Sequence, residues 1–280
     1  MSHTHTMVVT KLCMTARTHF LSLPQLCRSP LTLGGNRHLL LQRRFKQLHS
    51  SSSPPSISPI KMSTQIIEHI VLFKVKPDTD PSKIDSMITG LNSLISLHQV
   101  LHLTAGPLLR TRSSPFPFTH LLHSRYNSKD DLTAYSDHPS HLTVVTDFVK
   151  PICDDIMAVD WVADSSTPRL PSGSAMRVTF LKLKEGLVDT EKKREILDVI
   201  GGIKDVFPSI DQISFGENFS PARAKGFSIA SIAILPGLSE LEALDSNSEL
   251  VNLQKDKVRD LLDSVIVLDY VIPKPQNASL

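Results

Sequence analysis

One pattern of residues occurs twice in this 280-residue chain. The segment IEHIVLFKVKP (67–77) matches AMRVTFLKLKE (175–185), and MAVDWV (157–162) matches IVLDYV (266–271) at nearly the same offset. Self-similarity at a fixed period is the signature of a repeated structural unit. We therefore expect two copies of one fold, joined by the Ser/Pro/Gly-rich stretch ADSSTPRLPSGS (163–174), whose composition is typical of a linker.

Hydrophobic periodicity in the first copy predicts the order strand, helix, strand, strand, helix, strand. Residues 66–75 are apolar on both faces, as in a strand that is buried on both sides. Asp80 followed by Pro81 predicts the start of a helix, and Ser128 with Asp131 predicts the start of another. The first helix has an apolar stripe at spacings of three and four: Ile84, Met87, Ile88, Leu91, Leu94 and Ile95.

Strands around 99–110 and 117–126, separated by TRSSPFP, complete the first copy together with MAVDWVA. In the second copy Thr190 is the expected cap of the first helix. The other elements expected there are strands near 210–219 and 226–235, a helical stretch at about 239–262, and a last strand at 265–272.

The order βαββαβ is that of the ferredoxin-like split unit, so the predicted class is α+β with two tandem ferredoxin-like repeats. Each such sheet carries helices on one face and leaves the other face open. We expect the two open faces to stack and the sheets to pack into an α/β barrel. The predicted boundaries are an N-terminal targeting or disordered segment (1–62), a first domain (65–163), a linker (164–174), a second domain (175–273) and a C-terminal tail (274–280).

Charge is distributed unevenly along the chain. Residues 1–61 hold eight Lys/Arg and no acidic residue, whereas the remainder holds 22 basic and 28 acidic residues, a net charge of −6. The Arg- and Ser-rich beginning is typical of a plastid or mitochondrial transit peptide. The chain ends in Ala278-Ser279-Leu280, which has the small–x–Leu form of a peroxisomal signal but lacks its central lysine. Both locations are left open.

Several kinds of partner are disfavoured by the same counts. A mildly acidic body argues against a nucleic-acid partner. No run approaches the length of an apolar membrane helix, so we expect no membrane partner. Cys153 is alone in the body, and Cys13 and Cys27 lie in the N-terminal segment, so neither a disulfide framework nor a Cys-based zinc site is expected there.

Residues 134–145, AYSDHPSHLTVV, place Tyr135, His138 and His141 close together. His138 precedes Pro139 and is interpreted as a helix cap, and the remaining groups are open to acid–base chemistry or to a purely structural role. A Tyr–His pair can remove a proton next to a carbonyl and stabilise the resulting enolate near neutral pH. His69 and His120 lie on predicted strands and alternate with apolar residues, so both are expected to point into an apolar layer.

These segments resemble the stress-responsive A/B barrel domain in their order and spacing: IEHIVLFKVK, Gly106 at the end of the second strand, FTHLLHSRY, Tyr-x-x-His-Pro-x-His and VDWV. The resemblance covers roughly 65–163 well and 175–273 more weakly. It implies a barrel formed by two sheets, self-association either within the chain as a pseudo-dimer or as a homodimer, and, for the tandem plant members, a peroxisomal location.

The same family includes olivetolic acid cyclase, which closes an aromatic ring without a cofactor. That resemblance implies catalytic roles for Tyr135 and His141, with His69 and His120 lining a pocket for a hydrophobic small molecule. It also implies, for some members, a structural magnesium near the end of the first helix, at Asn92, Ile95, Ser96 and His98; no other cofactor is implied.

The second copy lacks every one of these imidazole and phenol groups. The positions equivalent to His69, His120, Tyr135, His138 and His141 hold Arg177, Ile229, Leu244, Asn247 and Leu250. Any pocket chemistry therefore belongs to the first copy. Two hypotheses remain: a non-enzymatic stress-response barrel protein, and a cofactor-free cyclase or binder of a hydrophobic small molecule.

Overall fold

The computed structural model describes residues 64–165, 169–186 and 190–274. The transit peptide expected at 1–61 and the tripeptide Ala278-Ser279-Leu280 lie outside these ranges.

The first repeat contains the expected elements and one strand more. Its elements are β1 (Thr64–Val75), α1 (Pro81–Ser93), the 3-10 turn η1 (Leu94–Ser96), β2 (His102–Pro107), β3 (Arg110–Ser113), β4 (His120–Tyr126), α2 (Lys129–Ser136), α3 (Pro139–Val144), the π-helical turn η2 (Val145–Val149) and β5 (Cys153–Ser165).

The second repeat follows the same order. Its elements are β6 (Ala175–Leu183), α4 (Thr190–Gly201), α5 (Ile203–Val206), β7 (Gln212–Glu217), the 3-10 turn η3 (Pro221–Arg223), β8 (Ile229–Leu235), α6 (Leu238–Ser246), α7 (Ser248–Asp256), the 3-10 turn η4 (Arg259–Leu261) and β9 (Leu262–Val271). Thr190 is the first residue of α4 and not its cap. The single helical stretch expected at 239–262 is divided into α6, α7 and η4.

The helix starts of the first repeat are formed by the predicted side chains. Asp80 accepts a hydrogen bond from the backbone N–H of Ser82, and Pro81 occupies the first helical position. Ser128 accepts from the N–H of Asp131 at the start of α2. His138 caps α3 by accepting from the N–H of Ser140, as interpreted from its place before a proline.

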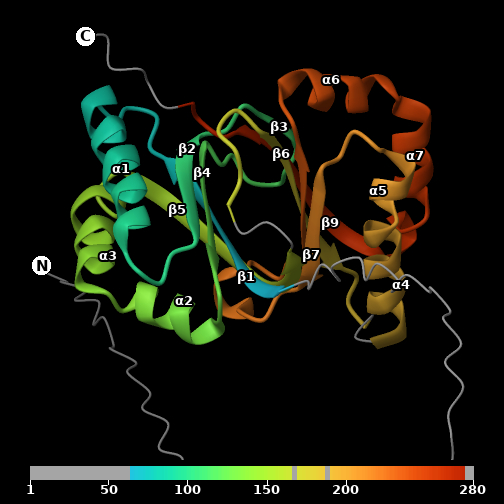
Figure 1. Ribbon diagram of the computed structural model, residues 1–280, viewed down its shortest axis with the longest axis horizontal. Coiled ribbons are helices and arrows are strands. Elements are labelled where there is room, and N and C mark those ends of the chain that lie inside the picture. The colour runs from blue at the N-terminus through green and yellow to red at the C-terminus, as the bar shows by residue number, and fades with distance from the viewer. Residues whose placement is uncertain (1–63, 166–168, 187–189, 275–280) are drawn as a thin grey trace, which may run out of the picture. The chain divides into compact units, whose positions relative to one another are not determined.

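Two antiparallel sheets carry the fold. The first has the order β2-β4-β1-β5 and the second β3-β9-β6-β8-β7. Figure 1 shows α1, α2 and α3 on one side of the sheets and α4 to α7 on the other. The inner faces are packed together and form a core from both repeats, which includes Ile70, Val159, Val178 and Leu268. Each such fully buried side chain contributes about 1.5–3 kcal/mol.

The two sheets stack as expected, but they do not close into a continuous barrel. At one junction β2 ends its pairing with β4 at Pro107, and the chain then joins the second sheet as β3, paired with β9. At the other junction β5 meets the second repeat through a single bridge, Trp161 to Asn218. Proline has no N–H to donate, and neither junction has an uninterrupted ladder. The two sheets therefore pack against each other without closing into the barrel that was expected.

Strand β3 overlaps the start of the TRSSPFP segment, which was expected to separate two strands of the first sheet. Arg110 pairs with Asp269 and Thr111 with Leu268, so this strand extends the sheet of the other repeat. The main chain confirms the exchange, because the N–H of Leu109 donates to the carbonyl of Asp269. The N–H of Phe219 donates in the same way to the carbonyl of Asp160. Each repeat thus extends an arm to the last strand of the other.

Candidate functional site

His69 on β1 is bonded to Asp160 on the neighbouring strand β5. The two residues are cross-strand partners, and the imidazole Nδ1 lies against a carboxylate oxygen. Both side chains are buried. A carboxylate on one ring nitrogen fixes the tautomer and orientation of a histidine, and leaves the other nitrogen to face its surroundings.

Two tyrosines and a second histidine lie beside this pair. The ring of His69 is 6.3 Å from that of Tyr126 and 6.5 Å from that of Tyr135, measured between centroids. The Tyr126 and Tyr135 rings are 5.2 Å apart, and the ring of His141 is 4.6 Å from that of Tyr135. The structure therefore brings together three of the four predicted residues, His69, Tyr135 and His141, in one aromatic cluster between the first sheet and its helices.

His120 is not part of this cluster. His69 is paired with Ser124 on β4, whereas His120 is opposite Phe73, four residues further along the ladder. At the rise of an antiparallel strand this separation is roughly 13 Å. The His120 ring is instead bonded to its neighbour, with Nδ1 2.8 Å from the Thr119 hydroxyl. Strand alternation correctly places His120 on the same face as His69, but at the other end of the strand.

Burial sets the protonation of the cluster. It raises the pKa of Tyr135, and it raises that of Tyr126 well above its usual range. Burial also lowers the pKa of His141, although the hydrogen bond from its Nδ1–H to the Ser136 carbonyl partly offsets this. At neutral pH the cluster therefore holds neutral phenols and a neutral His141.

Asp160 keeps its charge within this apolar surrounding. Burial by itself would raise the pKa of its carboxyl group, but His69, Ser220 and Arg223 favour the carboxylate and lower it. Ser220 and Arg223 belong to the second repeat, in and just before η3. Asn218 of the same arm accepts a hydrogen bond from the N–H of Asp160 at 3.2 Å. The candidate site thus takes side chains from both repeats, which the two separate sequence copies do not indicate.

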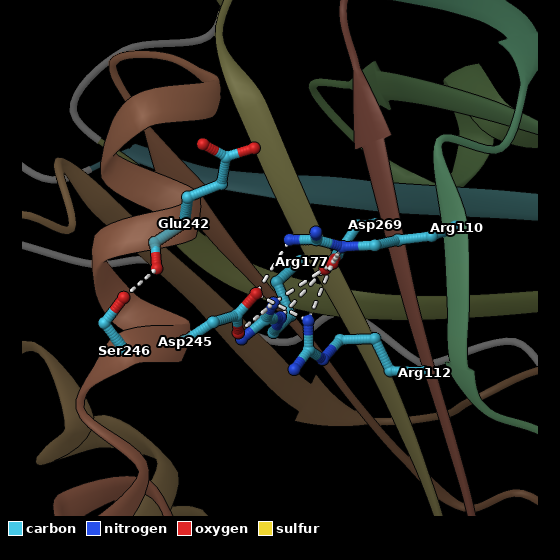
Figure 2. A network of polar contacts seen from close by, with 7 residues as sticks. All are labelled: Arg110, Arg112, Arg177, Glu242, Asp245, Ser246 and Asp269. Atoms are coloured by element: carbon cyan, nitrogen blue, oxygen red, sulfur yellow. Dashed lines mark hydrogen bonds and ion pairs between the residues drawn. The ribbon is translucent and has the colours of Figure 1, made fainter.

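The second repeat replaces this cluster with an ion-pair network. Arg177, at the position equivalent to His69, donates from Nε and Nη2 to the two carboxylate oxygens of Asp269, at 2.8 and 3.0 Å. Arg110 of the arm from the first repeat donates to Asp269 at 2.6 Å and to Asp245 at 2.7 Å. Arg112 also reaches Asp245. Figure 2 shows the three guanidinium groups around the two carboxylates.

A second charged group lies between the two sheets. It was not predicted, because β1 was expected to be apolar on both faces. Glu68 accepts hydrogen bonds from His123 at 2.6 Å and from Arg125 at 2.7 Å, and all three side chains are fully buried. Burial would raise the pKa of Glu68, but Arg125 and His123 lower it from 4.5 to about 2. The signal was present in the sequence, because Glu68 and Arg125 are charged residues within strands that were predicted to be buried.

The residues proposed for magnesium have other contacts. Asn92 joins α1 to β2, because its amide donates to the Ala105 carbonyl and its oxygen accepts from the Ala105 N–H, both at 2.9 Å. The Ser96 hydroxyl donates to the Ser93 carbonyl. Ile95 lies within η1, and His98 lies two residues after it. Among the described residues no group of three or more His, Cys, Asp or Glu side chains is arranged to hold a metal ion.

Two of the hollows on the surface of the described residues can be compared with the predicted site. One, of about 550 Å³, lies along α4 and is lined mainly by charged residues, among them Glu191, Arg194 and Asp198. The other, of about 460 Å³, lies between the end of α1, β2 and residues 169–172 and 272–274. Neither is lined by His69, His120, Tyr135 or His141. None of the described helices combines the length and apolar character needed to span a bilayer.

Two stacked βαββαβ units, each extending an arm onto the other, define a tandem ferredoxin-like protein of the α+β class. Comparison with known families gives the particular one. The model of the "Stress responsive A/B Barrel Domain" matches residues 67–163 and again 176–272, and the chain belongs to this family.

Similar proteins of the family occur in Arabidopsis thaliana. The chain is 57% identical to one stress-response A/B barrel domain-containing protein of that plant, over 86% of its own length and 88% of the relative. It is 47% identical to a second protein of the same description, over 75% of this chain and 98% of that one. Among solved structures, an anthrone oxidase-like protein matches with a TM-score of 0.50 and 10% identity, over 79% of this chain and 98% of that one. This last likeness shows the fold alone.

Proposed function

We propose that this chain is a non-enzymatic stress-response A/B barrel protein in which the first-repeat cluster holds the two repeats together. One observation carries the proposal: His69, Tyr126 and Tyr135 are buried and in ring contact with one another. Side chains that fill each other's space in this way stabilise a core, and each aromatic pair adds about 0.5–1.5 kcal/mol beyond its buried area. Asp160 extends the cluster to the arm of the second repeat.

Conservative variants of the full chain test this role. Tyr135→Phe keeps the ring and removes only the hydroxyl, so it should lower the free energy of unfolding by about 1 kcal/mol. His141→Ala should cost about 1 kcal/mol through the lost contact with Tyr135. Urea unfolding followed by circular dichroism measures both. Two variants as stable as the wild type would contradict a structural role for the cluster.

A second candidate function is a cofactor-free cyclase of the polyketide type, or a binder of a hydrophobic small molecule, using the first repeat. The observation that favours it is the hydrogen-bonded His69–Asp160 pair beside two neutral phenols and the half-buried, neutral His141. A neutral imidazole can accept the proton next to a carbonyl, and a neutral phenol can donate to the enolate. Tyr135 and His141 would be the acid–base pair, while His120 is too far along β4 to share the same reacting atoms.

Product analysis separates the two functions. The purified chain is incubated with a linear poly-β-ketoacyl thioester, and aromatic products are measured by mass spectrometry. The non-enzymatic proposal expects the same products with the wild type, with His141→Ala and without protein. An aromatic acid that forms with the wild type and is lost in His141→Ala, while the variant remains folded, would establish the cyclase function instead.

We also propose that the protein resides in peroxisomes, directed by Ala278-Ser279-Leu280, with residues 1–61 as the competing plastid or mitochondrial signal. A fluorescent protein fused at the N-terminus leaves Leu280 free and should label peroxisomes. Truncation of the last three residues should make that label diffuse. Plastid or mitochondrial labelling by a C-terminal fusion, with a diffuse N-terminal fusion, would assign the location to residues 1–61.

Self-association within one chain is the third part of the proposal. The exchanged arms at Leu109 and Phe219 support an intrachain pseudo-dimer, because each repeat completes an edge of the other. Light scattering on the purified protein should give the mass of one chain. A mass of two chains would support the alternative of a homodimer of the whole protein.

A further inference from the structure

The hollow of about 460 Å³ between the repeats is separate from the His69 cluster and is lined by apolar, basic and imidazole side chains. It is bounded by the end of α1 and by β2 from the first repeat, and by residues 169–172 of the linker and 272–274 after β9. Its volume lies within the range of small-molecule sites. Part of its wall is apolar, formed by Ile95, Leu101, Leu103, Leu170, Ile272 and Pro273.

Two cations stand at this hollow. Arg169 and Lys274 both line it, and both side chains are exposed. Neither forms an ion pair with another of the described residues, and none of the residues that line the hollow is acidic. Two unneutralised cations beside an apolar wall favour a ligand with a negative charge and an apolar body. They disfavour a cation next to Asn92 and Ile95, where magnesium was expected.

The third polar group is a buried imidazole. His102 lines the hollow, is only 7% exposed, and its Nε2 has no hydrogen-bond partner among the described residues. An unpartnered buried donor or acceptor is uncommon in folded proteins, because it loses its bonds to water without replacement. A ligand oxygen in the hollow would accept from this nitrogen in its protonated tautomer.

Lys274 is positioned by hydrogen bonds between the end of the second repeat and the linker. Lys274 follows two backbone hydrogen bonds that tie the end of β9 to the linker, from Gly173 N–H to the Ile272 carbonyl and from Ile272 N–H to the Ser174 carbonyl, both 2.9 Å. Gly173 has a φ of +88°, and the stem of Lys274 lies over it, so that a Cβ there would be 2.9 Å from Cε. The position of Lys274 therefore depends on a glycine.

We propose that this hollow is a binding site for a monocarboxylic acid with an apolar body, whose carboxylate is held by Arg169, Lys274 and His102 Nε2. The apolar body lies along Leu101, Leu170 and Ile272. Arginine binds carboxylates in a planar, two-point geometry, lysine adds a point charge, and the imidazole donor directs one oxygen inward. This site is independent of the function proposed for the His69 cluster, and it uses residues from both repeats and the linker.

Calorimetric titration of the full chain with sodium octanoate tests the proposal. Octanoate should bind with a dissociation constant below about 1 mM, and octanamide, which has the same body without the charge, at least ten times more weakly. Arg169→Gln combined with Lys274→Gln should weaken octanoate binding at least tenfold. Both side chains are exposed, so these variants should fold. Lys150→Gln, at an exposed lysine after η2, is the matched control and should leave binding unchanged.

Several results would overturn the proposal. Octanoate that does not bind to the wild type would show that the hollow is not a site for such acids. Octanoate that binds equally to the double variant would show that Arg169 and Lys274 do not hold its carboxylate. Octanamide that binds as tightly as octanoate would show an apolar surface without charge recognition. Inorganic phosphate that binds as tightly as octanoate would show a simple anion site and exclude the carboxylic-acid class. His102→Phe, which removes the donor and keeps a ring, should lower octanoate affinity several-fold, and a change in octanamide affinity of the same size would refute a role in holding the carboxylate.

Discussion

Arg177 makes with Asp269 the same strand-to-strand contact that His69 makes with Asp160 at the equivalent position of the other repeat. In both repeats the first strand carries a base and the last strand an aspartate, and an arm from the other repeat completes the pair. The first repeat uses an imidazole. The second uses guanidinium groups, which stay charged. The same geometry therefore holds one histidine–carboxylate pair in one half and a network of guanidinium–carboxylate pairs in the other.

This difference predicts unequal costs for one substitution made at both places. Asp269→Asn removes the fully buried carboxylate that Arg177 and Arg110 share and leaves them only the partly exposed Asp245, so it should lower the free energy of unfolding by about 3 kcal/mol. Asp160→Asn leaves a hydrogen-bond acceptor for His69, because the amide oxygen can take the place of the carboxylate oxygen, so it should cost about 1 kcal/mol. Urea denaturation of both variants at pH 7 measures the difference. Equal losses would show that charge is not what distinguishes the two sites.

Acid should destabilise the protein through Glu68. Its pKa is 4.5 when unperturbed and about 2 in the folded protein, where Arg125 and His123 outweigh the effect of burial. Because the folded value is the lower one, the stabilisation is present above pH 4.5 and is lost as the pH falls toward 2. A difference of this size corresponds to the order of 3 kcal/mol. Glu68→Gln should be less stable at pH 7 and should lose less stability than the wild type across this window in chemical denaturation.

His102 should make the stability of the folded protein depend on pH in a second, higher range. Burial, with the positive charges of its neighbours, lowers its pKa from 6.5 to about 3. Its neutral form is the one that the fold accepts, so stability is present above pH 6.5 and declines as the pH falls below that value. His102→Gln should flatten the decline between pH 6.5 and 4.5 while keeping the loss due to Glu68. An unchanged pH profile in this variant would show that His102 does not titrate on unfolding.

Gly216 on β7 lies against Trp161 and Val162 of the first repeat. A Cβ there would lie 2.8 Å from the Val162 carbonyl oxygen and 3.0 Å from a Trp161 ring carbon. A backbone oxygen cannot move without the strand, so Gly216→Ala should cost about 2 kcal/mol. Gly202→Ala is the control in the same repeat, because its φ is −74° and its nearest neighbour would be 3.5 Å away. Thermal unfolding that ranks the two variants equally would contradict the close contact.

The chain's single tryptophan reports on the junction between the repeats. Trp161 is fully buried, and its Nε1–H donates to the Ser214 hydroxyl of the second repeat at 3.1 Å. Its emission should be blue-shifted and should move to the red at the same denaturant concentration at which circular dichroism is lost, because the shared core makes unfolding cooperative. A fluorescence transition at lower denaturant than the loss of helix would mean that the repeats separate before either unfolds.

Local features of the fold were predictable from local residues. The helix starts at Asp80, Ser128 and His138 follow from capping side chains within three positions of the bonds they form. The repeat itself gave the order of elements and the class. Strand β3 could not be found in this way, because it pairs with β9, more than 150 positions away, and has neither an apolar run nor a turn signal of its own.

The candidate site was predicted only in part, because it too depends on pairing between strands that are distant in sequence. Strand alternation places His69 and His120 on one face, but only the register of β1 with β4 shows that they are four residues apart along it. Asp160 was not singled out, although VDWV and its counterpart LDYV both carry the aspartate. Its importance lies in its cross-strand partner, and partners across a sheet are not adjacent in sequence. Glu68 and Arg125 were missed because two charged residues were read as part of apolar strands.

The exchanged arms have a consequence for which substitutions the two repeats can accumulate independently. In an assembly of identical subunits, every substitution is made in both halves at once, so a cluster such as that around His69 is either kept twice or lost twice. Here one covalent chain supplies both halves at a fixed ratio, and their association does not depend on protein concentration. One half can therefore carry an ion-pair network around Asp269 while the other keeps an aromatic cluster around His69.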